Sequence, residues 1–262
     1  NFILSGLVFR GYKSVIDQVL QLGFNTIRIP FSSQMLITPL PVNKSINFNF
    51  NPDLRGLSPL QCMDQVVKYC GAVGLRVILD RHSSLADNGW KESLWFIPND
   101  SYYTENQFIQ DWQMLAQRYA GTYISQVTIL KPYHYNKYFR SMRVKGTTVI
   151  GADLWNDPKP PLSAWGWVGP NTRDWRIAAQ TAGNAILAVN SQWLIFVEGL
   201  GTNGWPGSDL TYVQSNPVVL SIPSQLVYSV HELSQDAYNQ TWFSSPTYPT
   251  NLRALWRSRW GY

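Results

Sequence analysis

The sequence is poor in cysteine and in charge: two of its 262 residues are cysteine, and charged side chains make up 14%. Cys62 and Cys70 lie eight positions apart in a helical pattern. About 12 Å of helix rise would separate them, which is beyond the reach of a disulfide. We therefore expect two free, buried thiols. Apolar residues reach 45% of the sequence, enough for a substantial core, which argues against intrinsic disorder.

A long apolar run is also absent, because no stretch approaches the roughly 18 consecutive apolar residues of a membrane-spanning helix. The start, Asn1 to Leu4, has neither an initiator methionine nor the basic region of a signal peptide. We expect the chain to begin at a cut inside a domain and to have no membrane partner. Its length suits one large α/β domain or two small ones.

Acidic residues are missing between Gly121 and Ala152, where five basic residues lie. These five account for the whole net charge of +5, so the remainder of the chain is neutral. Because the excess positive charge is confined to one segment, nucleic-acid binding by the whole protein is not expected.

Helical and strand patterns alternate along the chain. Expected helices occupy 12–22, 58–71, 104–119, 176–189 and 251–260, and expected strands occupy 24–30, 75–80, 149–154, 193–197 and 226–230. Ser58 and Pro59 are typical of a helix start. This alternation predicts a parallel sheet built from right-handed βαβ units.

Each expected strand ends in side chains capable of polar chemistry. They are Arg28, His82, Asn156 with Asp157, Glu198 and His231. Five consecutive strand ends of this kind favour an α/β fold of the (β/α)8 TIM barrel type, whose site is assembled from the carboxyl ends of the strands. A doubly wound sheet is the alternative, but it would place a glycine-rich phosphate loop after its first strand, and the sequence has none there.

The stretch from Thr148 to Pro158 joins a buried strand to polar groups. An apolar run typical of a strand covered on both faces is followed by Asn156, Asp157 and the proline. An amide and a carboxyl at such a strand end suggest a barrel active site. A turn that merely ends the strand is the structural alternative.

Five stretches of the chain resemble glycoside hydrolase family five, the cellulase family of (β/α)8 barrels, and within it the bacterial-type endo-β-1,4-glucanases. The stretches are 23–30, 74–82, 149–158, 194–199 and 226–231. The resemblance implies a single partial barrel domain over residues 1–262. Strands two to six would be present, and the chain would be truncated at both ends.

In this family two carboxylates cleave the glycosidic bond with retention of configuration, one as acid/base and one as a nucleophile about 5–5.5 Å away. The resemblance places Asp157 at the acid/base position. It gives Arg28, His82, Asn156 and His231 roles in building the substrate site, although a lone histidine at a strand end is often structural. It implies neither a metal nor a cofactor.

Tryptophan is abundant, with 12 in the chain, and indole rings can stack on sugars. Trp155 is the substrate-binding candidate beside the Asn-Asp pair. Trp90, Trp95 and Trp205 are further candidates, with packing in the core or in a lid as the alternative.

The chain departs from the family pattern at its catalytic positions. Asp157 stands where the family has Glu, which withdraws the carboxyl by about 1 Å. Leu233 stands where an aromatic is usual, and the strand with the nucleophile is expected to be absent because Glu198 and Glu232 follow earlier strands. We therefore expect hydrolysis of β-1,4-linked polysaccharide (cellulose or β-glucan) to be impaired or lost. A non-catalytic β-glucan-binding homologue is the alternative.

The basic segment is expected to be an insertion at 122–146, because family members pass almost directly from the preceding helix to the next strand. Helix-to-strand loops of about 2–6 residues are usual. Untranslated sequence joined in a gene model is one origin, and a functional loop that binds an anionic polymer is the rival. The resemblance further implies a polysaccharide substrate, a monomer and a secreted, extracellular protein.

Overall fold

The structure is a computed structural model that describes residues 6–39, 41, 45–87, 92–121, 147–166, 173–202, 205–237 and 239–260. Its centre is a sheet of five parallel strands in the order β1-β2-β3-β6-β9. These strands are β1 (Thr26–Ser32), β2 (Arg76–Ser83), β3 (Val149–Asp153), β6 (Leu194–Glu198) and β9 (Leu226–Ser229). The expected parallel sheet is confirmed, and each strand starts within two residues of its expected start.

The strand order follows the sequence, which distinguishes a barrel from a doubly wound sheet. Right-handed crossovers between sequentially ordered parallel strands all fall on one face of the sheet, whereas a doubly wound sheet reverses its order and carries helices on both faces. Among the described residues β1 and β9 are the two edges, so these five strands form an open part of a barrel. The doubly wound alternative is excluded.

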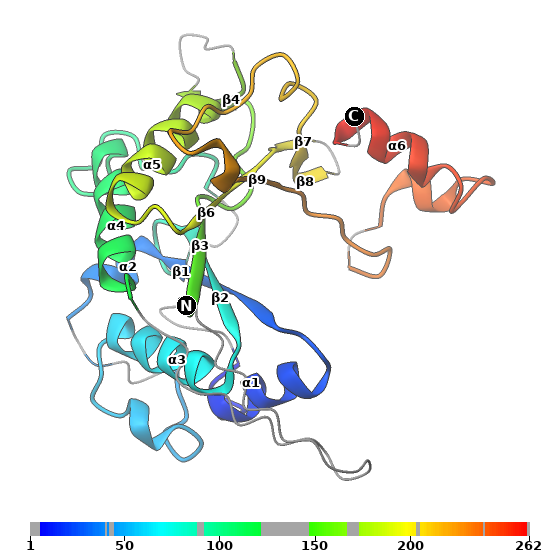
Figure 1. Ribbon diagram of the computed structural model, residues 1–262. Coiled ribbons are helices and arrows are strands. Elements are labelled where there is room, and N and C mark those ends of the chain that lie inside the picture. Colours follow the sequence, from blue (N-terminus) through cyan, green and yellow to red (C-terminus); the bar gives the residue numbers. More distant parts are fainter. Residues whose placement is uncertain are drawn as a thin grey trace.

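Helices alternate with the strands as the sequence predicts, and the short helix α2 occupies a stretch that was expected to be a loop (Figure 1). The helices are α1 (Tyr12–Gln21), α2 (Ser33–Ile37), α3 (Pro59–Val73), α4 (Glu105–Arg118), α5 (Trp175–Val189) and α6 (Leu252–Arg259). Helix α1 packs beside α3, and α4 packs beside α5. Short strands form two further pairs, β4 (Ser163–Ala164) with β5 (Arg173–Asp174) and β7 (Leu200–Thr202) with β8 (Trp205–Asp209).

The ends of α3 illustrate how local chemistry sets these elements. The Ser58 hydroxyl accepts from Gln61 N–H, and the Gln61 side chain accepts from Ser58 N–H, so two orphan donors of the first turn are satisfied. At the other end Gly74 takes φ 84°, a left-handed conformation that glycine adopts without a Cβ clash.

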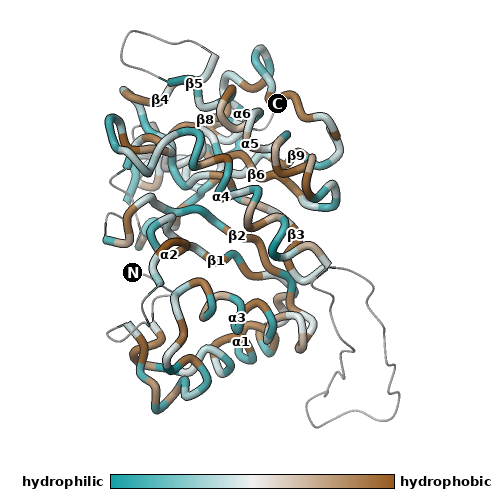
Figure 2. Tube along the Cα trace, turned by 90° about the vertical axis from the view of Figure 1, so that its left-hand side faces the viewer, coloured by the Kyte–Doolittle hydropathy of each residue, from teal (hydrophilic) through white to brown (hydrophobic). Residues whose placement is uncertain are grey.

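The core lies between the sheet and its helices, where the hydrophobic segments of the strands run through the middle of the molecule (Figure 2). Trp112, Trp175 and Trp193 are fully buried there. Cys62 and Cys70 are free and buried as expected, and burial raises the pKa of each thiol to about 12. Within the described ranges, no helix has the length and apolar character needed to cross a membrane.

The C-terminal segment projects from the body and ends in α6 (Figure 1). An ion pair of 2.7 Å between Arg259 Nη1 and Asp209 Oδ2 ties α6 to the β7–β8 pair. Trp256 Nε1 donates to Glu232 at 3.3 Å. The expected insertion at 122–146, the chain start and Trp90 lie outside the described residues, so those predictions stay open.

Candidate active site

Arg28, on β1, joins the carboxyl ends of four neighbouring strands. Its Nη1 lies 2.8 Å from Asp80 Oδ2, its Nε 2.7 Å from Asp153 Oδ2 and its Nη2 2.7 Å from Glu198 Oε1. Nη2 also donates to Asn156 Oδ1 at 3.3 Å. The parallel register makes this possible, because it brings residues 125 and 170 positions away in sequence to one edge of the sheet.

The three carboxylates around Arg28 outnumber the guanidinium and are shielded from water. The side chains of Asp80 and Glu198 are 0% exposed and that of Asp153 is 2% exposed. Burial raises the pKa of Asp153 to about 6, against the opposing charge of Arg28. Burial, together with the charge of Asp153, raises the pKa of Glu198 to about 8, although His231 and Arg28 oppose it. The acids at this edge of the sheet therefore release their protons at a higher pH than exposed acids do.

His231, directly after β9, bridges two carboxyl groups. Its Nε2 lies 2.9 Å from Glu198 Oε1, and its Nδ1 lies 3.1 Å from Asp157 Oδ1. Burial lowers the pKa of His231, but the bonds to Asp157 and Glu198 outweigh it and raise the pKa to about 10. An imidazolium with an N–H directed at each carboxylate satisfies both contacts.

Asp157 follows β3 in a left-handed backbone conformation with φ 51°, which non-glycine residues adopt at a cost. Its N–H donates to Glu198 Oε2 at 2.7 Å. The neighbouring Asn156 N–H donates to the carbonyl of Arg81 at 3.1 Å. The chain therefore bends at Asn156 after the strand, and the side chains of the Asn-Asp pair face the cluster around Arg28.

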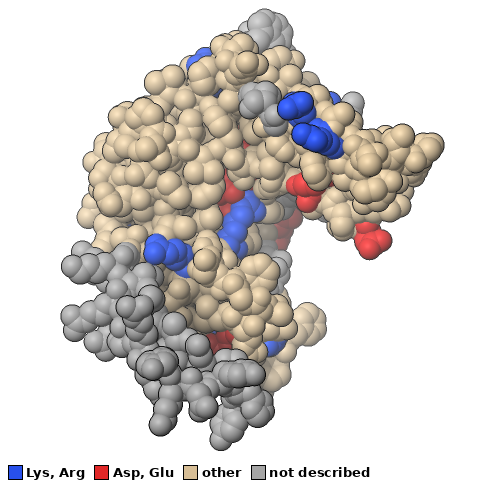
Figure 3. Space-filling view, turned by 45° about the vertical axis from the view of Figure 1, so that its right-hand side comes forward, with Lys and Arg blue, Asp and Glu red and all other residues tan. Residues whose placement is uncertain are grey.

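His82 stands at the end of β2 beside this cluster. Its Nδ1 lies 2.8 Å from Asp80 Oδ2, and its side chain is 36% exposed. In the space-filling view, acidic and basic side chains gather in a hollow beside the projecting C-terminal segment (Figure 3). The structure thus brings together Arg28, Asn156, Asp157 and His231 and sets His82 beside them.

Trp155 does not have the exposed ring that sugar stacking requires. It is fully buried, and the guanidinium of Arg81 lies 5.7 Å from its ring on one side of the core. Trp95 is also buried. Direct substrate contact by these two rings is therefore corrected to packing in the core, where Trp95 lies against Trp175. The Trp205 side chain lies outside the described part of the chain.

Three buried acids were not recognised as site residues from the sequence. Asp80 lies within β2, three residues before its end, whereas Asp153 and Glu198 are the last residues of β3 and β6. The sequence signal for them is an acid in or directly after an apolar run, since a carboxyl buried there needs a cation.

Asp153, Glu198 and His231 also offer ligand atoms that lie within 4.8 Å of one another. Arg28 holds an oxygen of each of the two acids, and Asp157 N–H holds the second oxygen of Glu198. An ion bound there would have to displace these partners, so the donor set fits an ion-pair network better than a metal centre.

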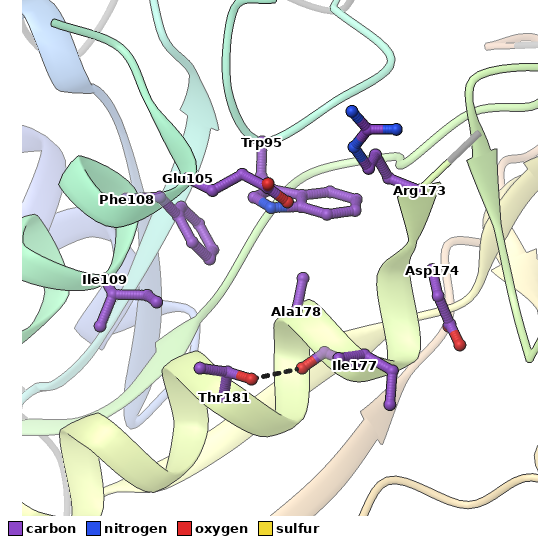
Figure 4. Close-up of a pocket in the computed structure, with 9 residues that line it drawn as sticks. All are labelled: Trp95, Glu105, Phe108, Ile109, Arg173, Asp174, Ile177, Ala178 and Thr181. Atoms are coloured by element: carbon purple, nitrogen blue, oxygen red, sulfur yellow. Dashed lines mark hydrogen bonds between the residues drawn. The ribbon is translucent and has the colours of Figure 1, made fainter. Parts of the chain in front are cut away.

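A separate cavity of about 340 Å³ lies between α4 and α5 (Figure 4). Phe108, Ile109 and Ala178 give it apolar walls, and the charged side chains of Glu105 and Arg173 lie at its rim. None of the residues around Arg28 lines it. This cavity is distinct from the edge of the sheet where the polar groups converge.

Comparisons with known proteins place the fold and the site in context. The sequence model for Cellulase (glycosyl hydrolase family 5) matches residues 5–128 and 135–262. An endoglucanase of Paenibacillus polymyxa is 40% identical over 269 residues, covering 100% of this chain and 60% of its own length. The major extracellular endoglucanase of Xanthomonas campestris pv. campestris is 32% identical, covering 100% of this chain and 49% of its own. The chain therefore spans about half to three fifths of the length of these curated relatives.

Solved structures agree with the sequence matches. A complex of an endocellulase variant from Pyrococcus horikoshii with cellotetraose superposes with a TM-score of 0.78 at 33% identity, covering 99% of this chain and 67% of that one. The catalytic domain of the major endoglucanase from Xanthomonas campestris pv. campestris gives a TM-score of 0.78 at 31% identity, covering 99% and 68%. The expected (β/α)8 barrel fold is confirmed, and the described residues contribute a sheet of five of its strands.

Proposed function

We propose a glycoside hydrolase function, directed at β-1,4-linked glucan, for this chain, which belongs to the cellulase family, glycosyl hydrolase family 5. The substrate class is supported by its relatives, which are named endoglucanases, and by the endocellulase structure that holds cellotetraose. An extracellular place of action follows, because one relative is named extracellular and polymeric glucan lies outside cells.

The observation that carries the proposal is the contact of Asp157 with His231. The carboxyl stands at the end of β3, 10% exposed, with the imidazole Nδ1 at 3.1 Å from Oδ1. In the proposed mechanism the proton on His231 Nδ1 passes through the Asp157 carboxyl to the glycosidic oxygen as the bond breaks. Asp157 later removes a proton from the attacking water, and that proton restores the imidazolium.

The second carboxylate of a retaining mechanism must be free to attack the anomeric carbon. Asp80, Asp153 and Glu198 do not meet this requirement, because they are buried and bonded to Arg28. The proposal therefore assigns the nucleophile to a carboxylate other than these three. Arg28 would keep such a neighbour ionised through its positive charge.

Asn156 and His82 are proposed to hold the sugar on either side of the cleaved bond. Asn156 Oδ1 accepts from Arg28 at 3.3 Å, which leaves the amide N–H groups directed away from the guanidinium and able to donate to a sugar 2-hydroxyl. His82 keeps Nδ1 on Asp80, so its exposed Nε2 is the atom available to substrate.

Glucan binding without hydrolysis is the second candidate. The specific observation in its favour is that the carboxyl at position 157 is one methylene shorter than Glu and is already held by His231. Misplacement of a reacting group by about 1 Å can cost about 10²-fold in rate.

The test is reducing-sugar release from carboxymethyl-cellulose. Two forms are compared: the chain itself, and a fusion that adds the flanking segments of the Paenibacillus polymyxa relative. Each carries Asp157, Asp157→Glu or Asp157→Asn. We expect the fusion with Asp157→Glu to release sugar at least 10-fold faster than with Asp157, and Asp157→Asn to be inactive. If no fusion releases sugar while cellotetraose still binds by calorimetry, hydrolysis is refuted and the binding candidate holds.

A further inference from the structure

Glu198 lies between Asp157 and His231, the two groups that carry the transferred proton in the proposed mechanism. Its side chain is 0% exposed at the end of β6. Oε2 accepts the N–H of Asp157 at 2.7 Å, and Oε1 lies 2.9 Å from His231 Nε2 and 2.7 Å from Arg28 Nη2. One carboxylate therefore binds the backbone of the proposed acid/base and the far nitrogen of its imidazole partner.

The β7–β8 pair closes over this carboxylate. Gly207, with φ 57°, comes so near that an added Cβ would lie 2.5 Å from Glu198 Oε2 and 2.6 Å from Asp157 Oδ1. Gly199 N–H donates to the Gly207 carbonyl at 2.8 Å, and His231 N–H donates to Ser208 Oγ at 2.7 Å. This packing leaves Glu198 no route to the substrate side, so its contribution must pass through the groups that it binds.

The bond to Asp157 N–H fixes the position of the Asp157 backbone, from which the acid/base carboxyl extends. Asp157 has a left-handed backbone, which costs energy for a residue other than glycine, so the surrounding contacts help to hold it. The Glu198 carboxylate supplies one of them, a charge-assisted bond to the N–H of that same residue. Because Asp is short, the place of its carboxyl depends directly on the place of this backbone.

The contact with His231 Nε2 fixes the direction and proton content of the imidazole. A carboxylate on one ring nitrogen sets the tautomer and orients the other nitrogen, here Nδ1, toward its partner Asp157. The other charged groups around His231 are Asp153 from β3 and Arg28 from β1, which shares Glu198 Oε1. Glu232, next in sequence, is directed to Trp256.

We propose that Glu198 is a positioning residue for the acid/base: it holds the Asp157 backbone and keeps a proton on the His231 nitrogen that faces the Asp157 carboxyl. The inference rests on the proposed role of Asp157. Glu198, a buried side chain on β6, does not touch the sugar, but it sets both the geometry and the proton content of the Asp157–His231 pair.

The first readout needs no turnover. The chain has three histidines, so selective labelling gives three imidazole signals in an NMR pH titration, and single substitutions assign them. We expect His231 to titrate at least two pH units above the ordinary value of about 6.5. In Glu198→Gln that midpoint falls by about two units, whereas Glu232→Gln, with the same chemical change next to His231, leaves it in place.

A second variant keeps the test decisive if Glu198→Gln does not fold. Asp157→Asn leaves the buried carboxylate intact, so His231 is expected to keep a raised midpoint there. An ordinary midpoint in Asp157→Asn, or in the unsubstituted chain, would show that Glu198 does not hold the proton, and the inference would be overturned.

The second readout is activity of the barrel-completed fusion with Asp157→Glu as the reference form. We expect Glu198→Gln to lower kcat about 10²-fold, the loss expected for misplacement by about 1 Å, with KM changed less than about threefold. The alkaline limb of the pH–rate profile shifts to lower pH. An unmoved limb would indicate a purely structural role and would overturn the inference. If no fusion is active, the proposed function fails, and the NMR titration still decides whether Glu198 holds His231.

Discussion

Raising the pH across neutrality is predicted to destabilise the fold. Glu198 has its pKa raised from 4.5 to about 8, and His231 has its pKa raised from 6.5 to about 10. In both cases the folded chain keeps a proton that the unfolded chain has released. Stability is therefore complete below the unfolded pKa and is lost as pH rises toward the folded pKa.

The two titration windows overlap between pH 6.5 and pH 8, which sets the size of the effect. One retained proton corresponds to a slope on the order of 1 kcal/mol per pH unit, so two give at most a few kcal/mol per unit. Asp153, with its pKa raised to about 6, acts below this window. Asp53, whose pKa is lowered by Lys13 and Tyr12 against the effect of burial, acts on the acidic side.

The assay is equilibrium unfolding in urea at pH 6.5, 7.25 and 8, followed by fluorescence of the 12 tryptophans. Glu198→Gln removes one of the two titrating groups, together with the negative charge that Glu198 gains as the pH rises and that helps His231 to stay protonated, so its slope is expected to fall to half or below. Glu232→Gln should keep the full slope. Stability that is flat or rises over this range, or an unchanged slope in Glu198→Gln, would refute the reasoning.

Two further substitutions probe the same cluster. Arg28→Met should cost about 3–5 kcal/mol in urea unfolding because three buried carboxylates lose their cation, whereas Arg10→Met at an exposed position should cost under about 1 kcal/mol; equal losses would contradict the ion-pair account. Gly207→Ala should lower the unfolding midpoint more than Gly56→Ala, since both glycines have positive φ but an added Cβ meets nothing within 4 Å at Gly56. Equal midpoints would show that the Gly207 backbone does not pack closely enough against Glu198 to exclude a Cβ.

Local patterns were sufficient to predict the elements of this fold. Apolar periodicity predicted the five strands and most of the helices, and Ser58 with Pro59 predicted the start of α3. Polar residues at successive strand ends predicted the edge where the site forms, because parallel strands deliver their carboxyl ends to one side. Each of these features depends on residues close together in sequence.

The buried partners of Arg28 could not be predicted in the same way. Its bonds to Asp153 and Glu198 span 125 and 170 positions, and they depend on the strand order and register. The burial of Trp155 has a similar origin, since its ring packs near Arg81 and that contact exists only after α4 covers the sheet. A single sequence indicates that an indole or a carboxyl is present but gives no direction for it.

The surroundings of Asp157 bear on why an aspartate stands there. Its N–H is held by Glu198, its carboxyl lies 3.1 Å from His231 Nδ1, and the backbone of Gly207 leaves no room for a Cβ beside it. A glutamate carboxyl is longer by one methylene, so it cannot keep this contact in the same direction without meeting the imidazole. We expect it to turn toward the hollow, where a sugar would bind. A gain in rate with Asp157→Glu would therefore mean that the backbone frame is competent and that the short side chain alone limits catalysis. An unchanged rate would mean that the contacts with Glu198 and His231, and not the length of the side chain, keep the carboxyl away from the substrate.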